Sequence, residues 1–193
     1  QLARSYAWLR CMSDDERSIG LWAVLRARLA GDALADLTAA GPVLGEPIKI
    51  AQLKNKLHLT ALASSLAVEN LTYALSSGLL VLAGTLTLLA VFAVADNIRA
   101  ASWLALLIVS VALLSLSLGL HRRWRVVSLL VSLASRVFPR AAVLLPRVLE
   151  LENYVFDFYT KRRSDFLIVA LCDLTFHFAG VVEIYITLQL IGY

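Results

Sequence analysis

Cysteine and histidine are scarce in this sequence, and their placement excludes several kinds of site. Cys11 and Cys172 are the two cysteines among 193 residues, which gives neither a disulfide framework nor a metal-binding spacing. The three histidines, His58, His121 and His177, are too scattered to predict a metal centre. GxSxG, HExxH, CxxC and Gly-rich phosphate-binding motifs are also absent, so we expect no soluble-enzyme chemistry, no metal and no cofactor.

Charge is low as well, and this sets the class of the protein. Only 17% of residues are charged and 60% are hydrophobic, with a mean hydropathy of +0.76. The apolar residues run in long blocks, and a block of about 20 spans a bilayer core of about 30 Å. The sequence therefore predicts one all-α, polytopic helical membrane domain over residues 1–193. The net charge of +4 comes from clusters at block ends, typical of topology signals, so no nucleic-acid partner is expected.

Three apolar blocks are predicted to be spanning helices, at residues 57–95, 101–120 and 166–192. As a helix the first would be about 58 Å long, nearly twice the hydrocarbon thickness. It must therefore project, tilt steeply or break near residues 76–78. Its polar side chains share one helical face, which should contact protein or water and not lipid: Ser65, Glu69, Thr72, Tyr73 and Ser76.

Two further regions, residues 18–56 and 126–165, are predicted to be interfacial or re-entrant. In the first, Ser18 is expected to cap a short charged helix, and the chain should turn at residues 41–42 and 45–47. In the second, arginines and prolines interrupt the apolar residues before an amphipathic helix.

Basic clusters predict the topology. Residues 121–125 and 161–163 are basic, as is the segment before the first span, so all three should be cytoplasmic. Residues 96–100 are almost neutral and should lie outside. This arrangement requires that residues 126–160 make no net crossing of the membrane.

The last apolar block carries Asp173, His177 and Glu183, the main indication of function. Ionisable groups at membrane depth are expensive and usually mark a pathway or a binding site. Asp173 and His177 share a helical face, whereas Glu183 lies about 80° to the side. These residues could bind a lipid headgroup or relay protons. Alternatively they form a structural network in which Asp173 and His177 pair with each other.

Two more acidic residues are candidates for the same pathway. Glu69 is either within the membrane or at a solvated surface. Glu46 follows Gly45 and precedes Pro47 and Lys49, where it could line the pathway or simply sit at a helix start. Gly41, Pro42, Gly45 and Pro47 are expected to form a structural turn, and Lys49 is included with the candidate substrate-binding residues.

Residues 31–49 resemble the signature of the lysylphosphatidylglycerol synthase transmembrane family, also called flippase-like membrane proteins. That signature has a small-residue segment, a Gly-Gly-Glu-Pro-type turn and a basic helix. Leu44 replaces the first Gly of the turn here. Residues 68–71, which contain Glu69, are similar to the helix that follows the turn. Glu183 and Gly192 are similar to a Glu and a terminal Gly of the family's late helix.

The resemblance, which covers most of residues 20–193, implies a bacterial inner-membrane, multi-pass protein with re-entrant helices and additional helices upstream. It implies transport of a membrane lipid, whether phospholipid, glycolipid or hopanoid type. The expected function is therefore flippase-like translocation of a polar headgroup through an intramembrane cavity lined by the acidic residues and His177. A membrane enzyme that modifies a headgroup, the membrane half of such an enzyme, and a non-catalytic scaffold are the alternatives. A homo-oligomer is an open question.

Overall fold

A computed structural model describes residues 1–38 and 41–192, and all its regular elements are helices. The all-α prediction is thus confirmed for the described part of the chain. In order, the elements are α1 Leu2–Cys11, η1 Glu16–Ile19, α2 Leu21–Leu37, α3 Gly41–Leu53, α4 Leu59–Val91, α5 Asp96–His121, α6 Val126–Val137, η2 Pro139–Leu144, α7 Leu145–Lys161 and α8 Arg163–Ile191.

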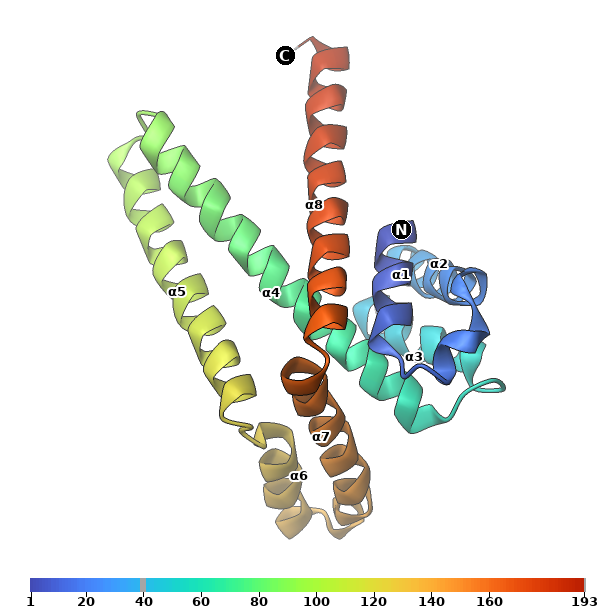
Figure 1. Cartoon of the computed structure of the whole chain (residues 1–193). Coiled ribbons are helices and arrows are strands. Elements are labelled where there is room, and N and C mark those ends of the chain that lie inside the picture. The colour runs from blue at the N-terminus through green and yellow to red at the C-terminus, as the bar shows by residue number, and fades with distance from the viewer. Residues whose placement is uncertain (39–40, 193) are drawn as a thin grey trace.

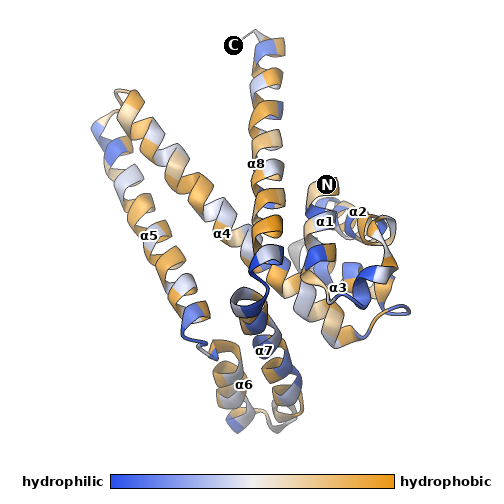
Figure 2. Ribbon diagram, viewed as in Figure 1, coloured by the Kyte–Doolittle hydropathy of each residue, from blue (hydrophilic) through white to orange (hydrophobic). Residues whose placement is uncertain are grey.

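Helices α4, α5 and α8 are each long and apolar enough to cross a membrane. Figure 1 shows α4 and α5 as a long antiparallel hairpin, with α8 crossing α4 below its middle. Apolar residues dominate all three helices, and hydrophilic residues gather at the α5–α6 and α7–α8 connections (Figure 2). Many large apolar side chains on their outer halves are exposed, as expected for helices that face lipid.

Helix α4 runs unbroken over 33 residues, about 50 Å. The helix therefore does not break near residues 76–78, which was one of the three predicted alternatives. Gly78 instead allows α5 to pack closely, because a Cβ at this position would lie 2.7 Å from Leu113 Cδ2. A helix of this length must tilt or project if it crosses a bilayer.

The ends of the long helices differ from the predicted bounds by a few residues. Helix α5 begins at Asp96, where a loop was predicted up to residue 100, and α8 begins at Arg163 instead of residue 166. Both helices carry an acidic residue in the first turn, Asp96 and Asp165. A negative charge there is favourable because the helix dipole is positive at its N-terminus.

Two local predictions for residues 18–56 are wrong. Ser18 lies in η1, and α2 instead begins after Gly20, whose φ of 82° favours glycine. Residues 45–47 do not turn: α3 continues through them with Pro47 inside the helix. The predicted turn at Gly41 coincides with the start of α3, although the Pro42 side chain and residues 39–40 lie outside what the structure describes.

Close packing against α2 explains why α3 tolerates Pro47, which removes one intrahelical hydrogen bond. A Cβ on Gly31 would lie 2.7 Å from the Gly45 carbonyl oxygen, and one on Gly45 would lie 3.1 Å from the Gly31 carbonyl oxygen. Glycine at both positions therefore lets the two backbones approach. Contact between α2 and α3 therefore keeps residues 45–47 helical, although their sequence is typical of a turn.

Helices α6 and α7 fold back on each other through η2, so this region returns to the end from which it started. Arg123, before α6, donates to Asp157 of α7 at 3.0 Å, and Arg125 donates to Asn153 at 3.3 Å. The basic segments 121–125 and 161–163 therefore lie at the same end of the bundle. The α4–α5 connection and the C-terminal end of α8 lie at the opposite end (Figure 1).

Helix α1 joins the two halves of the buried core. On one side Trp8 and Met12 pack with Val24 of α2 and Leu62 of α4. On the other side Ala7 and Cys11 pack with side chains of α4, α7 and α8, namely Val68, Val155, Phe158 and Val169. This arrangement brings α1, α2, α4 and α8 together around one set of charged residues.

Candidate functional site

The centre of that set is Glu69 of α4, whose side chain is completely buried. Its Oε1 accepts hydrogen bonds from Arg4 Nε at 3.0 Å and Arg4 Nη2 at 2.8 Å. Arg28 Nη2 of α2 lies 2.9 Å from the same oxygen, and its side chain is also fully buried. Two cations therefore share one carboxylate oxygen, and the solvated alternative for Glu69 is wrong.

Aromatic rings hold both guanidinium groups in place. Arg4 lies over the Tyr73 ring, with Cζ 3.8 Å from its centroid, which is cation–π geometry. Arg28 lies 5.7 Å from the centroid of Trp8, and the Trp8 indole N–H donates to Ser65 Oγ at 3.1 Å. The predicted polar face of α4 is thus confirmed as a protein-facing surface.

Asp173 of α8 joins the cluster without pairing directly. Its side chain is fully buried, and one helical turn further along α8 His177 stacks on the Tyr73 ring that Arg4 also covers. Neither carboxylate oxygen has a hydrogen-bond partner among the described residues. The predicted pairing of Asp173 with His177 is therefore not formed.

His177 contacts α4 instead. Its Nε2 lies 3.3 Å from Ser76 Oγ and 3.1 Å from Ser77 Oγ, and its ring stacks on Tyr73 at a centroid distance of 4.9 Å. Tyr73 thus connects the imidazole to Arg4. The structure brings three predicted site residues, Glu69, Asp173 and His177, to one place. We call Arg4, Arg28, Glu69 and Asp173 the charge cluster.

The charge cluster balances two cations against two carboxyl groups, but its hydrogen bonding is incomplete. Within the described chain, Nε and Nη1 of Arg28, the second oxygen of Glu69 and both oxygens of Asp173 lack hydrogen-bond partners, and Arg28 Nη2 makes only the ion pair with Glu69 Oε1. Buried polar groups are normally satisfied, and each unsatisfied group is costly. The cluster offers both donors and acceptors, so a guest with an anionic part and a hydrogen-bond-donating part would complement it.

Glu46 and Lys49 form a separate group in the α2–α3 hairpin. Lys49 is buried and its Nζ lies 2.8 Å from Asp32 and 3.0 Å from Glu46. Among the described side chains, neither residue shares a hydrogen bond or ion pair with the charge cluster. Glu183 is exposed on the outer half of α8. The six candidate residues therefore do not line one common cavity.

A second polar centre, around Asp165, joins α1 and η1 to the α7–α8 junction at the basic end of the bundle. Asp165 pairs with Arg10, with Arg17 at 2.7 Å and with Arg162 at 2.6 Å. Arg162 Nη2 also donates to the Met12 carbonyl at 2.8 Å, which satisfies the end of α1. This network fixes α1 against the α7–α8 junction, and hence positions Arg4.

Cys11 and Tyr154, beside the Asp165 centre, both have raised pKa values. Burial raises the pKa of the Cys11 thiol well above its usual value, so it is protonated and unreactive. Burial also raises the pKa of Tyr154 to about 12, and its hydroxyl donates to the Cys11 carbonyl at 2.6 Å. In the part of the chain that the structure describes, no group of histidine, cysteine and acidic residues could hold a metal ion.

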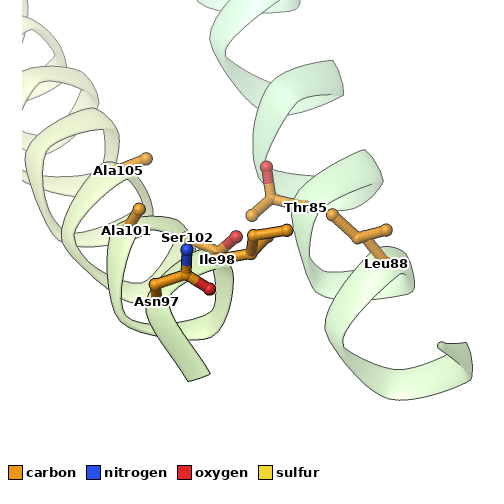
Figure 3. Close-up of a pocket in the computed structure, with 7 residues that line it drawn as sticks. All are labelled: Thr85, Leu88, Asn97, Ile98, Ala101, Ser102 and Ala105. Atoms are coloured by element: carbon orange, nitrogen blue, oxygen red, sulfur yellow. The ribbon is translucent and has the colours of Figure 1, made fainter. Parts of the chain in front are cut away.

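Two pockets lie on the α4–α5 hairpin. The outer one, about 440 Å³, is open, and Figure 3 shows Thr85 and Leu88 of α4 facing Ile98 and Ser102 of α5. It has no charged side chain. The inner one, about 600 Å³, lies at the basic end and is lined by α4, α5, α6 and α7. Neither pocket contains a residue of the charge cluster.

Sequence reasoning missed Arg4, Arg28 and Asp165. Arg28 interrupts the apolar face of a short helix, which indicated only that this helix is not a full span. Comparison with known proteins adds nothing to these assignments, since no family model, curated protein or solved structure matches the chain.

Proposed function

We propose that this chain is a multi-pass membrane protein that translocates a polar lipid headgroup between leaflets, and that the charge cluster binds that headgroup. In this proposal α4, α5 and α8 cross a bacterial inner membrane. The α2–α3 and α6–α7 hairpins are re-entrant or interfacial, since neither contains a helix of spanning length.

The observation that carries the proposal is the incomplete hydrogen bonding of Arg28, Glu69 and Asp173. A purely structural ion network would be stable only if its members satisfied one another. Here Nε and Nη1 of Arg28 and both carboxylate oxygens of Asp173 have no hydrogen-bond partner among the described residues. A phosphate oxygen could accept from Arg28 while an ammonium or hydroxyl group of the same headgroup donates to Asp173.

The position of the charge cluster fits a lipid substrate. Glu69 lies about 15 Å along α4 from its start, and Asp173 lies about 15 Å along α8 from its start, at 1.5 Å per residue. Apolar side chains on the outer faces of both helices are exposed. A headgroup bound at this depth could leave its acyl chains among those apolar side chains, which avoids the cost of burying a bare polar group in hydrocarbon.

Asp173→Asn tests the proposal directly, because Asp173 donates or accepts no hydrogen bond within the described structure. The substitution keeps the shape but removes the charge. We expect thermal unfolding in detergent to be little changed. Translocation of a fluorescent phospholipid in proteoliposomes, measured by dithionite quenching, should slow about tenfold or more, equivalent to one charge-assisted hydrogen bond.

Glu183→Gln is the matched control, because it makes the same type of change on an exposed position of the same helix. It should translocate lipid at the wild-type rate. Wild-type translocation by a folded Asp173→Asn protein would refute the proposed headgroup site. A wild-type protein that translocates no phospholipid or glycolipid would refute the transport function itself.

A further inference from the structure

A groove of about 180 Å³ lies between the first two turns of α4 and the η2–α7 junction, at the end of the bundle opposite the α4–α5 connection (Figure 1). Its apolar wall is formed by Leu59, Ala63, Leu144, Val148 and Leu151. Leu59 is 56% exposed and Leu144 is 50% exposed, so this wall opens toward the surroundings of the protein. Sites for whole small molecules measure about 300–1,000 Å³, so a groove of this size holds only part of a ligand.

Among the described residues, the groove has one charged side chain, Arg147. It is exposed, and both ion pairs of α7 use Asp157, with Arg123 and Lys161 as the cations. Glu150, one turn further along α7, is exposed and does not line the groove. The guanidinium group of Arg147 therefore has no anionic partner within the described chain. An arginine beside an apolar wall favours a ligand with a negative charge and an apolar chain.

The start of α4 favours the same charge. Thr60 and Ser64 each add a hydroxyl group, a possible donor, to the groove. His58, the N-cap residue, makes no capping hydrogen bond with its side chain, and the first turn of α4 contains no acidic residue. The positive end of the helix dipole is therefore not neutralised by a side chain. Because helix starts of this kind favour phosphate groups, α4 and Arg147 together are complementary to one phosphate.

Charge and shape together select the ligand. Among the described residues no acidic side chain lines the groove, so a cationic head would find no counter-charge there. The exposed apolar wall suits a molecule whose remaining apolar part lies in a bilayer. We propose that the groove binds an anionic phospholipid, with its phosphate at Arg147 and the start of α4 and the first part of one acyl chain along the apolar wall. The inference rests on the membrane location in the proposed function but not on translocation, since the groove contains no residue of the charge cluster.

A lipid bound here would hold α4 and α7 together, so binding can be measured as stabilisation of the folded protein. Purified protein in detergent is titrated with dioleoylphosphatidylglycerol, dioleoylphosphatidylcholine or dioleoylglycerol, and its thermal unfolding temperature is recorded against the mole fraction of lipid. Half-saturation with phosphatidylglycerol should need about tenfold less lipid than with dioleoylglycerol, which lacks the phosphate and so loses one charge-assisted hydrogen bond. Phosphatidylcholine should bind more weakly than phosphatidylglycerol, because its ammonium group offsets the phosphate charge.

Two arginine variants locate the phosphate. Arg147→Gln should raise the half-saturation point for phosphatidylglycerol about tenfold, to that of dioleoylglycerol, so the preference for the phosphate disappears. Arg136→Gln is the matched control, because Arg136 is an exposed arginine of the neighbouring helix α6 that does not line the groove. It should keep the wild-type preference.

A third variant tests the acyl chain. Ala63→Leu adds bulk to the apolar wall, so it should weaken the binding of all three lipids. If Ala63→Leu does not fold, the two arginine variants still decide the question.

Equal half-saturation of the wild type by phosphatidylglycerol and either other lipid would overturn the proposal. So would a preference for phosphatidylglycerol that survives in Arg147→Gln, since the phosphate would then bind elsewhere, for example at the charge cluster. Loss of translocation in the Asp173→Asn protein, or its absence in the wild type, leaves these expectations unchanged, so failure of the translocation function and failure of this site are distinguishable.

Discussion

Removing the carboxylate of Glu69 should destabilise the junction of α1, α2 and α4 more than any other single change in the charge cluster. Glu69→Leu leaves Arg4 and Arg28 without their shared counter-ion, and Arg28 is fully buried. Breaking a buried ion pair by removing one partner costs about 3–5 kcal/mol. Glu69→Gln keeps one acceptor oxygen, which can still receive a hydrogen bond from Arg4, so its cost should be smaller.

A double-mutant cycle separates the ion pair from general packing. Arg28→Leu removes one cation, and in combination with Glu69→Leu it removes the pair together, leaving Arg4 with Tyr73. The double variant should be less destabilised than the sum of the singles by about 0.5–3 kcal/mol, the range for directly coupled residues. Reversible unfolding in mixed detergent measures each free energy. Additive effects of the two substitutions would refute the view that Glu69 and Arg28 form one buried unit.

Three other outcomes are expected. Single cysteines at Arg122 and Arg163 should be shielded from an impermeant thiol reagent in intact cells while one at Asn97 reacts; the reverse pattern would show that the orientation is inverted. Gly31→Leu should destabilise the α2–α3 hairpin by about 1–3 kcal/mol in an unfolding titration, because its Cβ would lie 2.7 Å from the Gly45 carbonyl, and an unchanged midpoint would contradict this packing. Asp165→Asn, which weakens three arginine contacts, should lower thermal stability, and the exposed Asp14→Asn should not.

The long helices could be predicted from sequence because their signal is length and composition, which later packing does not change. A helix of spanning length is found at each of the three predicted places, residues 57–95, 101–120 and 166–192, with its ends shifted by a few residues. The polar face of α4 was also predictable, since a helix of known period fixes which side chains share a face.

The continuation of α3 through residues 45–47 was not predictable locally, because their Gly-Glu-Pro sequence is typical of a turn. Contact between Gly31 and Gly45, from different helices, decides the outcome there. In the same way, a helical wheel places Asp173 and His177 on one face but does not show that His177 turns toward Ser76 and Ser77. Such choices depend on a neighbouring helix whose position only the fold provides.

The partners of Glu69 were hidden for a related reason. Arg4 and Arg28 lie 65 and 41 residues away in the sequence, in short helices with mixed composition. Arginines in such helices are usually solvated, so neither stood out. Burial of these two guanidinium groups, and not the number of acidic residues in α8, identifies the candidate site.

An experimental structure of the protein in lipid nanodiscs would test the central proposal most directly. We predict density for a lipid headgroup within hydrogen-bonding distance of Arg28 and Asp173, with its acyl chains along the exposed apolar faces of α4 and α8. A structure in which Arg28 and Asp173 pair directly with each other, with no headgroup in the charge cluster, would contradict the proposal.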